Sequence, residues 1–121
     1  IKSVMEKLGF KEKGRYFVSL LQHLQPRHRE IGDVGGLGLA LRMELCERDR
    51  FTPNRAPAGR MFQRGLRGDL RIGSRTLGLI LDIGGYYKNG LTLAPSLDIT
   101  EEEMDLAHDL LDLLIHECVD A

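Results

Sequence analysis

The chain has 121 residues, of which 42% are hydrophobic and 29% charged, and its formal net charge is −1. These values are typical of one globular domain of ordinary size. They exclude a membrane span, because no apolar run approaches the roughly 18 residues that such a helix needs. Two cysteines are too few for a disulfide framework, and no signal-peptide pattern is present, so we expect a cytoplasmic protein. The chain begins with Ile1 and not with Met, which suggests a fragment of a longer protein.

The charges are unevenly distributed. Residues 42–75 contain nine arginines and four acidic residues, whereas residues 97–121 contain nine acidic residues and no lysine or arginine. An arginine cluster can mark a nucleic-acid surface. Aromatic residues do not alternate with these arginines, and no RNA-binding signature is present. An RNA-binding domain is therefore kept as a third interpretation only, and we expect no nucleic-acid partner.

The N-terminal part predicts two helices. Ile1, Val4, Met5 and Leu8 are spaced like the apolar face at the end of a helix. A second helix follows up to residue 24 and is stopped by Pro26. Its apolar face contains Phe17, Leu20, Leu21 and Leu24, and its outer face Lys11, Lys13, Arg15 and Gln22.

The glycine-rich stretch that follows leads into the clearest strand signal. From Leu37 to Leu45 every odd-numbered residue is Leu or Met, while the even-numbered ones are small or charged. Alternation at period two predicts a strand over Leu37–Cys46 with one buried face. The glycines before it leave room for a bulge or for the close approach of another backbone. Their spacing is not that of a dinucleotide-binding loop.

The middle of the chain predicts a loop, a short helix and a strand. Pro53 and Pro57 indicate the loop, and the helix over residues 56–65 would bury Met61, Phe62 and Leu66. The nearly continuous apolar run over residues 77–83 is typical of a strand that is buried on both faces.

The C-terminal part predicts a turn, a short strand and a helix. Asn89-Gly90 is a strong turn signal, and Leu91-Thr92-Leu93 reads as a brief strand that Pro95 ends. Thr100 and Glu103 form a capping-box pattern at the start of the last helix. Its apolar stripe contains Met104, Ala107, Leu110, Leu111 and Leu114, and Asp105, Asp109, Asp112 and His116 lie away from the centre of that stripe.

Together these elements predict an α+β fold. We expect a small, mainly antiparallel sheet of three or four strands with helices packed on one face. We treat residues 1–121 as one domain, in which residues 1–24 form the end of an interdomain helix and a second helix, and residues 31–121 form the α+β part.

The residue types alone indicate little chemistry. The four histidines lack the spacing of a metal site, and the serines lack the context of a hydrolase nucleophile, so we assign no catalytic and no metal-binding residue. Among the lysines only Lys88, in the Tyr86-Tyr87-Lys88-Asn89 loop, is placed where a ligand could be met.

Two segments resemble a known family. The sequence HREIGDVGGLGL of residues 28–39 and the sequence NGLTLAPSLDITEEEMD of residues 89–105 are similar to two segments of the class III pyridoxal-phosphate-dependent aminotransferases. They occur in the family's order and at a fitting separation. The family includes ornithine, 4-aminobutyrate and diaminobutyrate aminotransferases. The resemblance identifies this chain as the C-terminal small domain of such an enzyme.

The resemblance implies that the parent enzyme has two domains with different roles. In these enzymes the large domain carries the Schiff-base lysine and the aspartate that pairs with the pyridine nitrogen of the cofactor. We therefore expect pyridoxal phosphate in the full-length parent and no cofactor-binding residue in this chain, which should be inactive alone. The expected partners are the large domain of the same polypeptide, a second copy in a homodimer, and an amino-acid substrate. The parent would transfer an amino group from an amino acid or diamine-type donor to a 2-oxo acid.

Two positions depart from the family pattern. Gly35 stands where the family has arginine, and Thr92 stands where many members have the arginine that grips a substrate carboxylate. Arginine suits that role because its planar fork binds a carboxylate at two points. Either the parent enzyme uses another cation, for which Lys88 is the candidate, or its amino donor is not bound there as a simple α-amino or ω-amino acid. The expected substrate-binding residues are Thr92, Lys88, Tyr86, Tyr87 and Asn89.

The alternative interpretation is a free-standing α+β module that binds amino acids or regulates another protein. The fragment interpretation predicts exposed apolar surface, including Ile1, Val4, Met5 and Leu8, and hence self-association.

Overall fold

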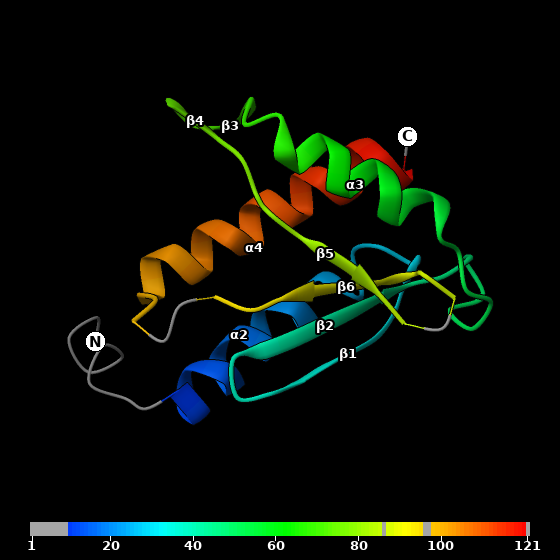
Figure 1. The fold of residues 1–121 in the computed structure, drawn as a ribbon, viewed down its shortest axis with the longest axis horizontal. Coiled ribbons are helices and arrows are strands. Elements are labelled where there is room, and N and C mark those ends of the chain that lie inside the picture. The colour runs from blue at the N-terminus through cyan, green and yellow to red at the C-terminus, as the bar shows by residue number, and fades with distance from the viewer. Residues whose placement is uncertain (1–9, 86, 96–97, 121) are drawn as a thin grey trace.

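Figure 1 shows the fold, a computed structural model that describes residues 10–85, 87–95 and 98–120. The helices are α2 (Phe10–Leu24), α3 (Ala56–Leu66) and α4 (Glu101–Ile115), and a π-helical turn, η1 (His116–Asp120), follows α4. The strands are β1 (Ile31–Leu37), β2 (Ala40–Leu45), β3 (Leu70–Ile72), β4 (Arg75–Leu77), β5 (Asp82–Gly84) and β6 (Gly90–Leu93). The helix expected to end near residue 8 lies outside the described residues.

The main sheet has four strands in the order β1-β2-β6-β5, and all of its pairings are antiparallel. Strands β3 and β4 form a separate two-stranded sheet. The α+β class and the four-stranded antiparallel sheet are therefore as predicted. No helix among the described residues is both long and apolar enough to cross a membrane.

The two faces of the main sheet differ sharply. Odd-numbered residues of β2 and β6 are buried against the helices, among them Leu41, Met43 and Leu91. They form one core with side chains of all three helices: Phe17, Leu21, Leu24, Ala58, Met61, Met104, Ala107, Leu110, Leu111, Leu114 and Ile115. We call the opposite face, which carries the even-numbered residues from Arg42 to Glu44 and from Gly90 to Thr92, the outer face.

The single strand predicted over Leu37–Cys46 is wrong in extent, because the chain forms a hairpin there. Gly38 lies at φ +58° in the turn between β1 and β2, and Leu39 follows it in that turn. A Cβ atom on Gly14 would lie 2.0 Å from the carbonyl oxygen of Gly38, so α2 and the turn meet backbone to backbone. The pairing of β1 with β2 shifts register between Ile31 and Val34, so the ladder is irregular in the glycine-rich stretch.

The strand predicted over residues 77–83, buried on both faces, is also wrong. Leu77 ends β4, Asp82 begins the edge strand β5, and Ile80 between them is 78% exposed. The intervening chain turns against the end of α3, where the Leu79 amide donates to the carbonyl of Gly65 over 3.1 Å. A continuous apolar run does not by itself distinguish a central strand from a segment pinned to a helix.

Two side chains do not have the exposure that was predicted from their place on the helix. Lys13 is only 3% exposed, because it lies four residues before Phe17 on the same helical face. Leu66, expected inside, is 50% exposed at the last residue of α3.

Helix α4 begins as predicted and packs beside α2 through polar contacts. Thr100 and Glu103 form the complete capping box. Tyr16 donates to Asp105, and His28 Nε2 lies 2.7 Å from Asp112 Oδ1. Burial raises the pKa of the Tyr16 phenol, and the Asp105 carboxylate raises it further. The acidic residues beside the apolar stripe of α4 thus include Asp105, which holds the helix to α2, and Asp112, which holds it to the turn that follows α2.

Candidate substrate-binding site

A surface hollow of about 460 Å³ lies over the outer face. Its floor consists of residues from β2, β5 and β6, and its walls come from the loops over residues 46–53 and 85–89. We call it the outer hollow. Its lining residues are Arg42, Glu44, Cys46, Phe51, Pro53, Gly84, Gly85, Tyr87, Asn89, Gly90 and Thr92.

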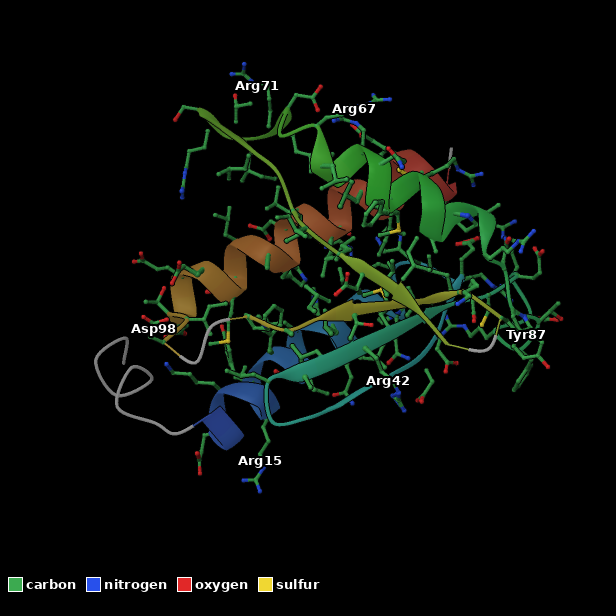
Figure 2. The ribbon with its side chains drawn as sticks, in the orientation of Figure 1. Arg15, Arg42, Arg67, Arg71, Tyr87 and Asp98 are labelled. Atoms are coloured by element: carbon green, nitrogen blue, oxygen red, sulfur yellow. The ribbon has the colours of Figure 1, made fainter. Side chains whose placement is uncertain are left out.

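Antiparallel pairing places Thr92 in the floor beside a cation. Thr92 lies opposite Arg42 on β2 and opposite Asp82 on β5. Residues that pair directly across neighbouring strands project from the same face of the sheet. Figure 2 shows Arg42 pointing away from α3 and α4. A hydroxyl and a guanidinium therefore share the floor of the outer hollow.

Arg42 is held by one ion pair. Its Nη2 lies 2.7 Å from Asp33 Oδ2, and the two side chains are 49% and 60% exposed. A single-point contact at such exposure leaves guanidinium donors for water or for a ligand.

The expected site residues are only partly brought together. Thr92, Tyr87 and Asn89 line the outer hollow, whereas Lys88 lines a neighbouring depression with Pro53, Asn54, Arg55, Ala56 and Tyr87. Tyr86 lies outside the described residues. Lys88 is exposed and has a left-handed backbone at φ +58°. Its side chain therefore starts from the rim and not from the floor.

Asn89 positions the loop. Its side chain is buried, and its Nδ2 donates to the carbonyl of Leu45 over 2.8 Å. The Leu45 amide in turn donates to the Asn89 carbonyl, also over 2.8 Å. These two bonds fix Asn89, at the end of the loop, to the end of β2.

The opposite wall is built around Asp49. Its carboxylate accepts from the amides of Phe51 and Thr52 and from the Thr52 hydroxyl, at 2.6 to 2.9 Å. These hydrogen bonds lower the pKa of Asp49 below its usual value, with the Thr52 hydroxyl contributing most. The turn presents Phe51 with 85% of its surface exposed. A rigid turn thus carries an aromatic ring at the edge of the outer hollow.

Sequence reasoning missed Arg42 as a candidate. The alternation in β2 placed it on the outward side, but the strand partners that bring it beside Thr92 are nearly 50 residues away in the chain. The available signal was its position on the same face as the short strand at residues 91–93. Using that signal needed the register, which the residue pattern does not supply.

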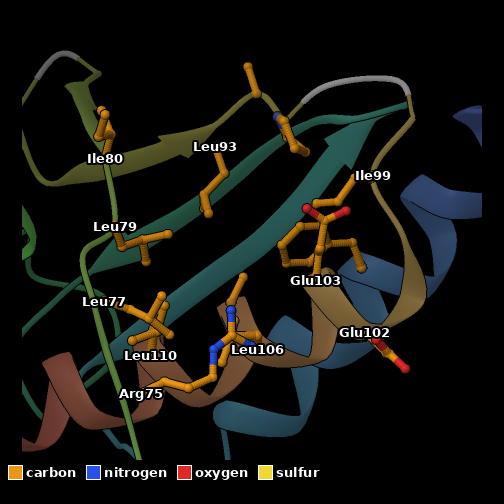
Figure 3. A pocket seen from close by; sticks show the side chains of 14 residues that line it. Arg75, Leu77, Leu79, Ile80, Leu93, Ile99, Glu102, Glu103, Leu106 and Leu110 are labelled. Atoms are coloured by element: carbon orange, nitrogen blue, oxygen red, sulfur yellow. The ribbon is translucent and has the colours of Figure 1, made fainter. Parts of the chain in front are cut away.

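A second hollow, of about 550 Å³, is apolar. Figure 3 shows Leu77 and Leu79 on the extended segment and Leu106 and Leu110 on α4 among the side chains that line it. Its charged lining residues are Arg75, Glu102 and Glu103. The leucines of this lining can bind apolar groups, and Arg75, Glu102 and Glu103 add charged groups to it.

No group of three or more metal-ligating side chains occurs among the described residues. Of the residues that the structure describes, no lysine lines the outer hollow: Lys88 lines the neighbouring depression and Lys13 is buried in the helical layer. The residues of this hollow therefore do not fit a covalently held carbonyl cofactor.

Sequence comparison finds relatives along nearly the whole chain, although no family model matches it. The chain is 30% identical over 115 residues to alanine–glyoxylate aminotransferase 2 homolog 2 of Arabidopsis thaliana, which covers 91% of the chain and 22% of that protein. It is 32% identical over 108 residues to the 5-aminovalerate aminotransferase DavT of Pseudomonas putida, covering 89% and 22%. An alanine/serine racemase of Pyrococcus horikoshii is 26% identical over 106 residues, covering 88% and 20%.

Solved structures share the fold. An aminotransferase from Bacillus anthracis superposes with a TM-score of 0.73 at 23% identity, over 88% of this chain and 23% of that one. A phospholyase from Arthrobacter, in complex with phosphoethanolamine, gives 0.74 at 22% identity, over 88% and 24%.

The chain spans 22% of the length of each of the first two curated relatives, so the relationship concerns one part of these enzymes. Over about nine tenths of its length, the chain is thus a relative of the class III aminotransferases and corresponds to their C-terminal small domain.

Proposed function

We propose that this chain is the part of a pyridoxal-phosphate-dependent aminotransferase that closes over the substrate. The parent enzyme would transfer an amino group from an amino acid or diamine-type donor to a 2-oxo acid. The observation that carries this proposal is the sequence relationship to aminotransferases over 91% of the chain. The position of the two resembling segments supports it, because β1 and β6, on which they lie, flank β2 and its outer-face arginine.

The cofactor would be held elsewhere in the parent. Pyridoxal phosphate supplies an electron sink for chemistry at the amino-bearing carbon. Because the outer hollow lacks a lysine, we place the Schiff-base lysine on a large domain of the same polypeptide. The large domain and a second copy in a homodimer are the partners that follow from this assignment, in a cytoplasmic enzyme.

The chain's own contribution would be to bind and orient. The Arg42 guanidinium can hold a carboxylate, and the Thr92 hydroxyl adds one neutral hydrogen bond. The Phe51 and Tyr87 rings can cover the apolar part of a substrate and exclude water from it. Lys88 lies at the rim, where its ammonium can attract an incoming anion.

The test uses the complete polypeptide encoded by the gene, with added pyridoxal phosphate and a panel of amino donors and 2-oxo acids. Amino transfer by the complete polypeptide, and none by the 121-residue chain, is the expected result. A complete polypeptide that moves no amino group would overturn the proposed function. Transfer by the 121-residue chain alone would overturn the placement of the cofactor.

The role of Lys88 is tested in the same enzyme. Lys88→Ala should raise the KM for the amino acid without a comparable change in kcat, because a rim cation acts on encounter and binding. Lys2→Ala removes a lysine far along the sequence from the loop and is the matched control. An unchanged KM in Lys88→Ala would remove this residue from the site.

A free-standing amino-acid-binding module is the second candidate. Arg42 and Glu44, two residues apart in β2, both line the outer hollow and could meet the carboxylate and the ammonium of one zwitterion. Calorimetry of the 121-residue chain with free amino acids separates the two candidates. The module predicts saturable binding that requires both charges of the ligand, whereas the aminotransferase part requires the carboxylate only.

A further inference from the structure

We propose that Arg42 is the specificity-determining residue for the substrate carboxylate, and that Asp33 is a resting partner which the ligand displaces. This inference rests on the proposed function and identifies the group that binds the substrate carboxylate in that site.

The guanidinium of Arg42 occupies space that a glycine leaves open. Gly35 lies directly opposite Arg42 on β1, and a Cβ atom built on Gly35 would lie 3.0 Å from Nη1 and 3.5 Å from Cζ. A side chain at position 35 would therefore compete with the guanidinium for the same volume. Gly35 and Arg42 form a matched pair in which β2 supplies the cation and β1 makes room for it.

Arg42 also lies beside Thr92, the position at which many members of the family have an arginine. Its other cross-strand partner is Thr92, whose hydroxyl oxygen lies 3.8 Å from a Cβ atom built on Gly84. The glycine on β5 leaves the hydroxyl open on the floor of the outer hollow. The absence of arginine at positions 35 and 92 is thus accompanied by an arginine between them, on the same face.

The ion pair between Arg42 and Asp33 is of a kind that a ligand carboxylate can replace. The Arg42 and Asp33 side chains meet at one contact, of 2.7 Å, and both are about half exposed. An ion pair of this kind is screened by water and adds little stability, so a ligand carboxylate can replace it. Until then, Asp33 keeps the guanidinium over Gly35.

The acidic residues near Arg42 determine which anionic ligands can bind in the outer hollow. Glu44 lines the outer hollow two residues from Arg42, and Asp82 lies opposite Thr92 but does not line the hollow. A second carboxylate placed near Glu44 would be repelled. The geometry thus favours ligands with one carboxylate at the Arg42 end over those with two neighbouring carboxylates.

The first experiment measures binding of pyruvate to the 121-residue chain by NMR titration, following the backbone amides of residues 33–35, 42 and 92. Arg42→Gln should weaken binding about tenfold or more, because a charge-assisted bond is lost, and Arg42→Lys should restore part of it. Asp33→Asn should tighten binding about two- to fivefold, because the competing carboxylate is removed. The control is Arg15→Gln, which removes the same charge at an exposed position of α2 and should bind pyruvate like the native chain.

Arg42→Gln should weaken pyruvate binding and Asp33→Asn should tighten it. A damaged fold cannot explain both results, since it would not bind pyruvate more tightly. Equal pyruvate affinity in Arg42→Gln and the native chain would overturn the inference, as would weaker binding in Asp33→Asn.

The second experiment uses the complete enzyme and compares an amino acid with an amine that has no carboxylate. Arg42→Gln should raise the KM for the amino acid about tenfold or more and leave kcat/KM for the amine within twofold of native. Equal losses for both donors would overturn the inference and leave the proposed function standing. A complete polypeptide without any amino transfer would overturn the proposed function, and the pyruvate titration would still decide whether Arg42 binds a carboxylate.

Discussion

Two helical glycines, Gly14 and Gly59, should respond in opposite directions to the same substitution. Alanine is favoured over glycine inside a helix by about 1 kcal/mol. At Gly59 in α3 nothing lies within 4 Å of an added Cβ, so Gly59→Ala should gain close to this amount. At Gly14 in α2 the added Cβ would lie 2.0 Å from the carbonyl oxygen and 2.6 Å from the carbonyl carbon of Gly38.

The clash at Gly14 is between backbones and cannot be relieved by a change of rotamer. Restoring ordinary contact requires α2 to move more than 1 Å from the hairpin turn, and overpacking of this kind costs about 1–3 kcal/mol or more. We therefore expect a net loss of up to roughly 2 kcal/mol or more for Gly14→Ala once the gain of about 1 kcal/mol in helix propensity is subtracted.

Urea unfolding of the 121-residue chain, followed by circular dichroism, measures both variants. The midpoint should rise for Gly59→Ala and fall for Gly14→Ala, with similar m-values. If Gly14→Ala is as stable as Gly59→Ala, α2 does not meet the β1–β2 turn backbone to backbone, and the placement of that helix is wrong.

Three further substitutions test the loops and the last helix. Asn89→Ala should lower the free energy of unfolding by about 1 kcal/mol, because the Leu45 carbonyl loses one of its two donors and keeps the Asn54 amide; equal urea midpoints would contradict the role given to this amide. Thr100→Ala should cost about 1 kcal/mol by removing the N-cap, and Thr76→Ala, at an exposed strand position, is the control that should cost less. The lowered pKa of Asp49 means that this group stabilises the fold above its unfolded pKa, and that this stability is lost as the pH falls through the folded pKa. Asp49→Asn should therefore reduce the change in stability between pH 6 and acid, and an unaltered pH profile would refute the loop contacts.

Local patterns predicted the elements that depend on neighbours in sequence. The capping box at Thr100 and the alternation over Leu41–Leu45 are set by residues within one turn or one strand, and both occur in the structure. The two wrong strands fail for a shared reason. A hairpin turn at Gly38 and a pinned segment before Leu81 depend on contacts with α2 and α3, which no local period encodes.

The site was less predictable than the fold. Thr92, Tyr87 and Asn89 were named from the loop and the resemblance, and all three line the outer hollow. Arg42 was not, because its closeness to Thr92 comes from antiparallel register between strands distant in sequence. Lys13 shows the same limit on a helix, since a charged residue was assumed to face water although its spacing places it on the buried face.

The most direct measurement traces a ¹⁵N-labelled amino group from donor to acceptor by mass spectrometry, with the complete polypeptide and the 121-residue chain assayed side by side. We expect label in the new amino acid with the complete polypeptide, no label with the 121-residue chain, and loss of labelling from amino-acid donors in Arg42→Gln. Unlabelled product from the complete polypeptide under every donor would contradict the assignment of this chain to an amino-transferring enzyme.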